Sequence, residues 1–361
     1  MAYTTIDDPS AYFHTQLYTS DSGNTQSITN NANAGNFKPD FIWAKSRADI
    51  GGYEISHDLV DSSRGRAASL HSDTDGAETT ASQTNYDLIS FDTNGFTTGA
   101  PENTNSLGGG AVGKVAWQWK ANGGTTASNT DGTITSTVQA NQDAGFSIVT
   151  YTGNGTDGAT VGHGLGAVPA MVLFKCRDTS NTDWRIYHQS ISPTNALSLN
   201  SAGAQYGASG VFGGTFTSTL LKVENDTGAN RNTSPMIAYC FAEKQGYSKF
   251  GKYVGNGNSN GPFVYTGFKP AFVLIKRTDS TGGWTIYDTK RGYNGNNYEL
   301  FPHSNEAEYT GTLYFEADIL SNGFKLRLTD GQINASGGSY IYMAFAENPF
   351  VTSTGIPTTA R

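Results

Sequence analysis

Residues 270–276 read Pro-Ala-Phe-Val-Leu-Ile-Lys, residues 169–175 read Pro-Ala-Met-Val-Leu-Phe-Lys, and residues 39–45 read Pro-Asp-Phe-Ile-Trp-Ala-Lys. Each copy is a short apolar run, rich in β-branched and aromatic residues, that follows a proline, and such a run is typical of a β-strand. Apolar side chains occupy both alternating positions, so we expect a central strand covered on two sides. Three copies of one stretch predict a fold built from repeats.

The similarity extends beyond this run. Each copy also ends in a closing apolar run, and the later two share an opening that leads to Gly-Asn-Gly and a Trp-x-Ile-Tyr sequence. The closing runs lie at residues 115–119, 237–243 and 341–347. The openings lie at residues 145–155 and 246–257, and the Trp-x-Ile-Tyr sequences lie at residues 184–187 and 284–287. The copies cover roughly residues 10–120, 145–244 and 246–350, and about 100 residues is the usual size of a β-sandwich module. We therefore expect an all-β fold of three tandem β-sandwich modules.

The segments beside these copies have separate assignments. Residues 121–144 are rich in Gly, Ser, Thr and Asn, which predicts a linker or an extended exposed strand between the first two modules. The junction at residues 243–246 is short, so the second and third modules are expected to pack together. Residues 1–20 begin with an acidic stretch and a proline before the first strand, and we interpret them as an attachment segment outside the core. Residues 351–361 are assigned as a C-terminal tail.

The composition argues against several classes of protein. Charged residues make up 15% of the chain and aromatic residues 12%, whereas a disordered chain is usually charge-rich and aromatic-poor. A net charge of −8 without a basic stripe argues against a nucleic-acid partner. No run approaches the length of a membrane span, so no membrane insertion is expected. The only two cysteines, Cys176 and Cys240, are expected to be buried free thiols of a protein made in a reducing cytoplasm.

Catalytic and metal-binding patterns are weak. The six histidines are scattered singly, and neither a zinc motif nor a nucleophile elbow is present. Residues 73–78 resemble the start of a calcium loop, but the glutamate is sixth rather than twelfth, so an acidic turn is the plainer explanation. Glu243 and Glu347 recur after Phe-Ala in separate copies, which favours a structural role over a catalytic pair. We expect no enzyme activity, no cofactor and no metal.

An Asp-x-x-Arg-Gly sequence occurs at residues 61–65 and again at residues 288–292, whereas the second copy has His188 at the equivalent position and no arginine. An arginine of this kind can clamp a carboxylate ligand. The alternative is an internal Asp–Arg pair that fixes a turn, with the glycine at a positive φ. We favour the internal pair, because a motif repeated within one scaffold usually serves that scaffold.

The best candidate for ligand binding is the loop at residues 292–298. Aromatic rings suit the C–H faces of sugars, and amides bond sugar hydroxyls. The same Asn-Gly sequence could instead supply the geometry of a hairpin turn, and the two interpretations stay open here. The candidate residues are Tyr293, Asn294, Asn296, Asn297 and Tyr298.

The opening at residues 5–13, Thr-Ile-Asp-Asp-Pro-Ser-Ala-Tyr-Phe, resembles the N-terminus of a family of virion proteins from marine and freshwater bacteriophages. Further stretches are similar to phage tail-fibre and related structural proteins, namely residues 131–155, 161–166, 246–251 and 345–350. The resemblance implies jelly-roll or concanavalin-like modules in a part of the virion that is exposed to the host. It supplies no catalytic residue.

The resemblance and the residues together lead to a functional expectation. We expect a non-enzymatic tail fibre or fibre-like appendage that is made in the host cytoplasm, joins other virion proteins of the tail, baseplate or capsid, and attaches to host-surface glycans. A homo-oligomer is expected, and a trimer suits a fibre, because closed symmetry buries exposed sheet edges. The alternatives are a purely structural capsid decoration or adaptor and, ranked last, a polysaccharide depolymerase.

Overall fold

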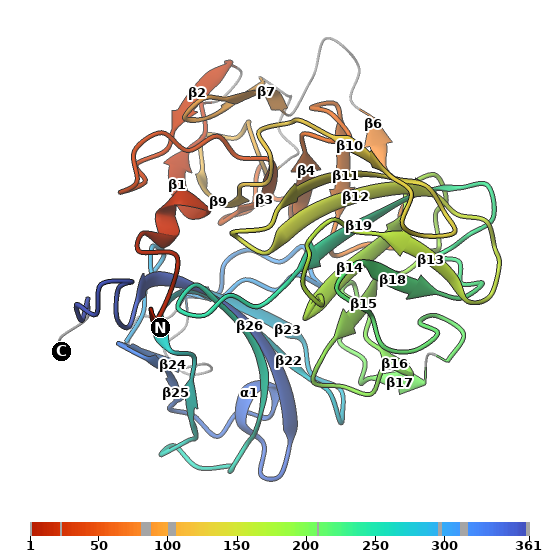
Figure 1. Ribbon diagram of the computed structural model, residues 1–361. Helices are drawn as coiled ribbons and strands as arrows, with labels where there is room; N and C mark the ends of the chain where they lie inside the picture. Colours follow the sequence, from red (N-terminus) through yellow and green to blue (C-terminus); the bar gives the residue numbers. More distant parts are fainter. Residues whose placement is uncertain are drawn as a thin grey trace.

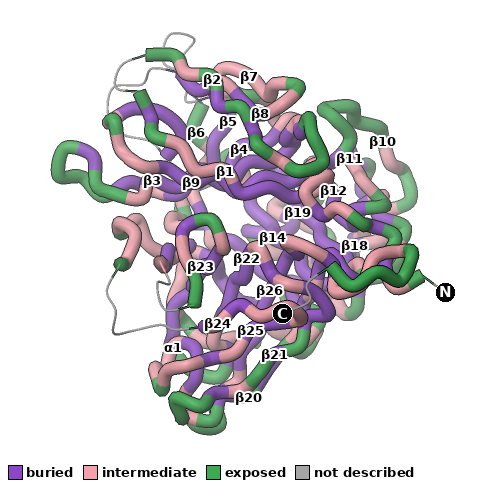
Figure 2. The backbone as a smooth tube through the Cα atoms, turned by 90° about the vertical axis from the view of Figure 1, so that its left-hand side faces the viewer, coloured by how far each residue is buried: buried purple, intermediate pink, exposed green. Residues whose placement is uncertain are grey.

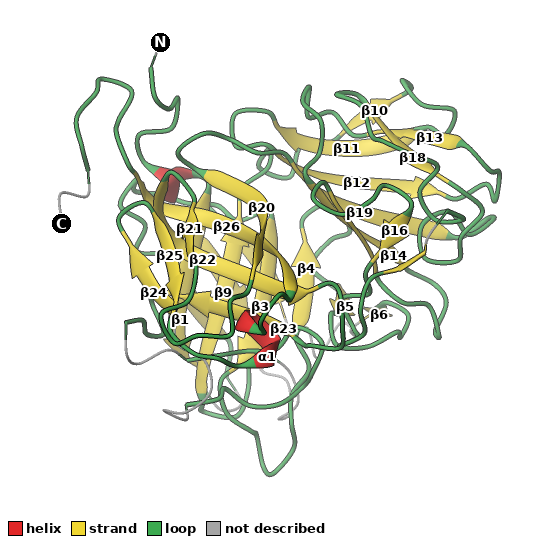
Figure 3. Cartoon of the chain, turned by 90° about the horizontal axis from the view of Figure 1, so that it is seen from below, coloured by secondary structure: helices red, strands yellow, loops and turns green. Residues whose placement is uncertain are grey.

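The regular secondary structure of the described residues is almost entirely β-strand, as the computed structural model in Figures 1 and 3 shows. The structure describes residues 2–21, 24–80, 88–99, 106–207, 209–294, 298–310 and 317–358. All strand pairs that the named strands form are antiparallel, so the expected all-β class is confirmed. The described helices are short turns in connections, η1 (Pro9–Ala11) and α1 (Gly331–Asn334).

Repeat 1, which we define as residues 10–120, forms a six-stranded sheet in the order β1-β9-β3-β4-β5-β6 and a small sheet in the order β2-β8-β7. The strand that follows the proline, β3, lies in the middle of the large sheet. The strands are β1 (Phe13–Thr19), β2 (Gln26–Thr29), β3 (Phe41–Ser46), β4 (Asp58–Asp61), β5 (Ala68–His71), β6 (Thr79–Thr80), β7 (Leu88–Asp92), β8 (Gly95–Thr98) and β9 (Gly113–Trp119).

Repeat 2, which we define as residues 121–244, forms a six-stranded sheet in the order β10-β11-β12-β19-β14-β15, beside two-stranded sheets of β13 with β18 and β16 with β17. Segment 121–144 thus contributes two strands to this sheet rather than a linker; β10 is largely exposed, as the alternative expected, whereas β11 carries buried residues such as Val138. The strands are β10 (Ala127–Asn129), β11 (Ser136–Asn141), β12 (Phe146–Thr152), β13 (Ala159–Gly162), β14 (Met171–Cys176), β15 (Arg185–His188), β16 (Asn195–Ala196), β17 (Tyr206–Gly207), β18 (Leu220–Val223) and β19 (Pro235–Phe241).

Repeat 3, which we define as residues 246–350, forms a four-stranded sheet in the order β20-β26-β22-β23 and a small sheet in the order β21-β25-β24. In all three large sheets, the strand after the proline lies next to the closing strand, which in turn pairs with the opening strand. The strand order therefore recurs with the sequence repeat, while the number of independently folding modules stays a prediction. The strands are β20 (Ser248–Val254), β21 (Phe263–Tyr265), β22 (Phe268–Arg277), β23 (Trp284–Asp288), β24 (Ala317–Leu320), β25 (Gly323–Leu326) and β26 (Ser339–Pro349).

The three large sheets share one central core, where buried backbone is concentrated in Figure 2. On β22, Phe272 and Leu274 point into this core, whereas Val273 and Ile275 belong to a second cluster within repeat 3. The strands β3 and β14 alternate in the same way. The prediction of a central strand covered on two sides is thus confirmed, and one of its two covers is the neighbouring repeats.

The contacts between neighbouring repeats, which we call seams, use equivalent residues of the closing strands. In one seam the Tyr239 hydroxyl of repeat 2 donates a hydrogen bond to Asp61 of repeat 1 at 2.8 Å. In another, the Trp117 indole N–H of repeat 1 donates to Asp288 of repeat 3 at 3.0 Å. The third closing strand has Met343 at this register position, which offers no such donor.

The Asp-x-x-Arg-Gly sequences are internal pairs, as favoured above. Arg64 is bound to Asp61, and both side chains are fully buried; Arg291 and Asp288 repeat this arrangement. Gly65 has a φ of 93°, within the region that favours glycine. The aspartate of each pair also accepts the hydrogen bond from the Trp or Tyr side chain of the neighbouring repeat. Each pair therefore fixes its own turn and forms part of a seam.

A second carboxylate extends each of the two charged seams. Glu78 of repeat 1 binds Arg64 and also Arg177 of repeat 2. Glu308 of repeat 3 binds Arg291 and Arg47, and Arg47 belongs to repeat 1. In the third seam, the His188 ring pairs with the Tyr342 carbonyl oxygen at 3.2 Å without a second charge. The repeats therefore close into a ring, in which repeat 3 returns to repeat 1.

The interpretation of residues 1–20 as a segment outside the core is wrong. Ile6 and Phe13 belong to the central core, and β1 is a full strand of the large sheet of repeat 1. The Thr4 hydroxyl donates to the Gln245 carbonyl oxygen at 2.8 Å, which ties the N-terminus to the junction of repeats 2 and 3. The tail beyond residue 350 also folds back, since Ser353 bonds Asp7. An attachment role for either end of the chain stays a prediction, because these contacts do not bear on it.

The seam contacts predict a stability difference between two tyrosine variants. Tyr239→Phe removes a hydroxyl that joins Asp61 and Arg64, and leaving buried charged partners unsatisfied should lower the free energy of unfolding by about 1–3 kcal/mol. Tyr247→Phe is the matched control, because the buried Tyr247 hydroxyl has no hydrogen-bond partner in the structure. Urea unfolding of both variants measures the difference. Equal stability of the two variants would contradict the role given to the seam.

Candidate functional site

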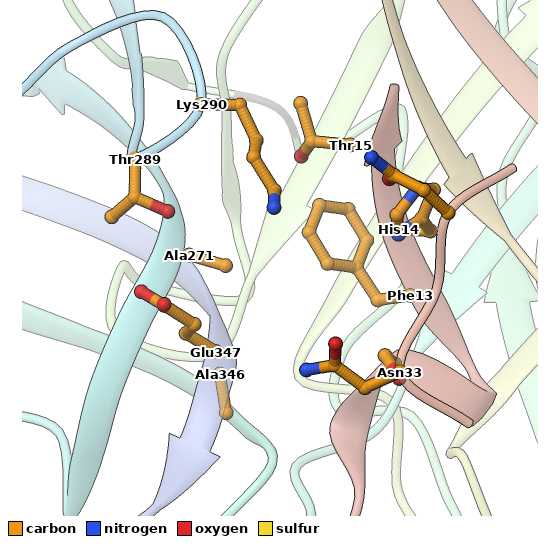
Figure 4. A pocket seen from close by; sticks show the side chains of 11 residues that line it. Phe13, His14, Thr15, Asn33, Ala271, Thr289, Lys290, Ala346 and Glu347 are labelled. Carbon is orange, nitrogen blue, oxygen red and sulfur yellow. The ribbon is translucent and has the colours of Figure 1, made fainter. Parts of the chain in front are cut away.

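A pocket of about 70 Å³, here called the seam pocket, opens between repeats 1 and 3 (Figure 4). Its walls come from the opening strand β1 and a nearby loop on one side, and from β22, β26 and the turn after β23 on the other. Three apolar residues and a set of polar side chains share the lining. The lining residues are Ser10, Phe13, His14, Thr15, Asn31, Asn33, Ala271, Thr289, Lys290, Ala346 and Glu347.

One lining residue, Thr15, is smaller than its equivalents in the other two repeats. Thr15 pairs with Trp117 in the sheet, as Ile148 pairs with Tyr239 and Phe250 with Met343. Ile148 and Phe250 are buried in the central core. Thr15 is also buried, at 4% exposed, but its hydroxyl has no hydrogen-bond partner in the structure and lines the seam pocket. An unpaired buried hydroxyl costs stability, and because the Thr15 oxygen is almost fully shielded from solvent, a ligand group would have to enter the wall of the pocket to satisfy it.

The opposite wall also differs from the other seams. In repeat 1 the residues after the aspartate, Ser62 and Ser63, bond Gln139 of repeat 2. In repeat 3 the equivalent residues are Thr289 and Lys290, whose side chains make no hydrogen bond or ion pair with the described residues. Figure 4 shows the Lys290 ammonium pointing toward the space beside the Phe13 ring.

The charge at the seam pocket is set by Lys290. Glu347 is paired with Lys269, with 2.9 Å between Nζ and Oε2, so these two charges offset one another. Burial lowers the pKa of His14 below its ordinary value; the hydrogen bond with Gln16 opposes this shift and the Lys290 charge adds to it. His14 is therefore neutral at pH 7, and the solvent-exposed Lys290 ammonium carries a positive charge beside the pocket that no carboxylate among the described residues pairs with.

The predicted loop lies beside this pocket only in part. The Tyr293 ring is 38% exposed and lies 5.3 Å from the Lys269 ammonium, next to Glu347 of the pocket. The Asn294 side chain bonds both the N–H and the carbonyl of Ile319, at 2.6 and 3.2 Å, so it holds β24 in place.

The other predicted residues are Asn296, Asn297 and Tyr298. Tyr298 lies under the Arg47 guanidinium at 6.0 Å. Asn296 and Asn297 lie outside the described residues. A ligand-binding role for the predicted loop stays a prediction.

The remaining candidates are occupied by structural contacts. In the turn at residues 73–78, Asp73 accepts hydrogen bonds from Ser56 and His57, and Glu78 belongs to a seam, which agrees with an acidic turn. Glu243 is paired with Lys249. Both cysteines are free and buried. Within the described ranges, no group of three or more His, Cys, Asp or Glu side chains is placed to hold a metal ion, and no helix there is long and apolar enough to span a membrane.

Sequence reasoning missed Thr15 and Lys290. The signal that could have identified Thr15 is its register, because a threonine stands where the other two copies place Ile148 and Phe250. Lys290 lies within the Asp-x-x-Arg-Gly sequence, between the aspartate and the arginine, at a position that the motif does not specify.

The space beside Thr15 predicts that a larger side chain fits there. Thr15→Ile introduces the residue of repeat 2 and removes an unpaired hydroxyl, so the free energy of unfolding should stay within about 1 kcal/mol of wild type or rise. Thr285→Val is the matched control, because the Thr285 hydroxyl is also buried and unpaired but lies outside the pocket. Thermal unfolding checks both variants. A loss of more than about 2 kcal/mol for Thr15→Ile alone would show that the pocket cannot be filled.

A family model described as "Domain of unknown function (DUF7483)" matches residues 8–349 of the chain. No curated protein and no solved structure matches it. The matched range includes strands of all three repeats and every residue that lines the seam pocket.

Proposed function

We propose that this chain, which belongs to the DUF7483 family of domains of unknown function, is a non-enzymatic appendage of a phage particle that attaches to glycans on the host surface. A tail fibre or fibre-like protein is the form we favour, made in the host cytoplasm and joined to other virion proteins of the tail, baseplate or capsid. The virion assignment rests on the sequence resemblance. The attachment role rests on the seam pocket.

The observation that carries the attachment role is the preformed seam pocket, whose lining includes Thr15 with its buried, unpaired hydroxyl. Around it lie the amides of Asn31 and Asn33, which can bond sugar hydroxyls, and the exposed Tyr293 ring flanks the same surface. The pocket is smaller than the roughly 300–1,000 Å³ typical of drug-sized ligands. It therefore suits one substituent of a sugar, with the rest of the sugar lying outside.

A contact of this size is weak, so attachment requires several copies. Ile148 and Phe250 occupy the equivalent positions of the other two seams. The seam pocket is therefore the binding site that one chain contributes to attachment. Linked sites can raise avidity by about 10²–10⁴. A homo-oligomer, with a trimer as the expected form, supplies this multiplicity. Because the three repeats close on one another in a ring, the oligomer contacts would use outer surfaces rather than the seams.

The alternative is a capsid decoration or adaptor with a purely structural role. One observation favours it: Phe263 and Tyr265 are 44% and 54% exposed and alternate with buried Val264, so both rings point outward from β21. Exposed aromatic rings of this kind suit a partner protein. A depolymerase has the least support, because Glu243 and Glu347 are each engaged by a lysine.

A glycan array and retention of host envelope material test the attachment role. The intact oligomer and the Thr285→Val control should bind, whereas Thr15→Ile should lose at least about 10-fold in apparent affinity, because an isoleucine fills the pocket and supplies no donor. Chain length of host polysaccharide should stay unchanged after incubation. Absence of any retained glycan would overturn the attachment role in favour of the adaptor, and equal binding by Thr15→Ile would move the site elsewhere.

A further inference from the structure

We propose that the seam pocket binds a carboxylate, so that the glycan recognised by this protein carries an acidic sugar. The inference rests on the proposed function and adds the chemical class of its ligand. It starts from three side-chain groups of the pocket lining that make no hydrogen bond or ion pair with the described residues, namely the buried Thr15 hydroxyl, the half-buried Thr289 hydroxyl and the solvent-exposed Lys290 ammonium. An ammonium offers three donors and no acceptor, and each hydroxyl can donate once. Together they suit a group that only accepts hydrogen bonds.

The surrounding charges also favour an anion. Among the described residues, Glu347, Asp288 and Asp8 beside the pocket each contact a side chain other than Lys290. His14 is neutral at pH 7 because burial lowers its pKa. A hydrogen bond between an ammonium and a carboxylate is stronger than one between neutral groups. The partnered carboxylates are Glu347 with Lys269, Asp288 with Arg291, and Asp8 with Ser10.

The shape of the pocket agrees with a carboxylate on a sugar ring. A space of about 70 Å³ holds a carboxylate and the carbon that bears it, but not a whole pyranose. Phe13, Ala271 and Ala346 form the apolar part of the lining, against which C–H groups can pack. Figure 4 shows Thr15 and Lys290 approaching the same space from opposite repeats, so the anion would bridge repeats 1 and 3.

The test uses the full-length protein on an array of glycans that contain uronic or sialic acids, each printed beside its carboxyl-reduced counterpart and a sulfated neutral glycan. Wild type should prefer the acidic glycans over the reduced forms by at least about 10-fold. Lys290→Gln should remove this preference, because it removes the charge and keeps a polar side chain of similar length. Lys252→Gln, at an exposed lysine of β20 that does not line the pocket, should retain it.

Each other outcome has a defined meaning. Equal binding of acidic and carboxyl-reduced glycans, with a loss for Thr15→Ile, would overturn the carboxylate and leave the proposed function standing. Preference for sulfated over carboxylated glycans would assign the pocket to a different anion and also overturn the proposal. Unchanged preference in Lys290→Gln would overturn the role of the lysine. Absence of binding to every glycan would overturn the proposed function itself.

Discussion

Three aromatic residues at equivalent positions of the closing strands constrain the whole structure. Trp119, Phe241 and Phe345 contact one another, with ring centroids 5.5 to 6.0 Å apart. Each ring belongs to a different repeat, so burying them requires the three large sheets to meet at one place. Aromatic side chains bury a large area and prefer such tilted contacts, which makes this cluster a strong constraint. The ring of repeats and its seams follow from it.

Differences among the repeats then decide what each seam can do. Where a closing strand carries Trp117 or Tyr239, the facing repeat supplies a buried Asp–Arg pair; where it carries Met343, the facing repeat has His188. The larger the side chain on the closing strand, the smaller its paired side chain on the opening strand, so that Trp117 lies beside the small Thr15. A threonine beside the largest of these residues leaves the polar space of the seam pocket. The candidate site is thus a local departure from the repeat.

The sequence predicted the elements better than their assembly. Repeated apolar runs placed the central strands, and repetition of the Asp-x-x-Arg-Gly sequence identified an internal pair, because both depend on local chemistry. The shared core could not be predicted, because a sequence repeat shows that copies exist but not which faces of the copies pack together. The same gap explains why Phe13 was placed outside the core and why Thr15 was missed. Asn294 suited a sugar by its amide, but that amide holds the backbone of Ile319 instead.

Native-state hydrogen exchange of a Trp119→Ala variant tests most directly whether one aromatic core holds the three repeats together. Removing a buried tryptophan costs about 3–5 kcal/mol. If the core is shared, backbone amide protection should fall in the closing strands of all three repeats, at residues 113–119, 235–241 and 339–349. A loss of protection limited to residues 113–119 and their partners within repeat 1, with the other two closing strands protected as in wild type, would contradict this account.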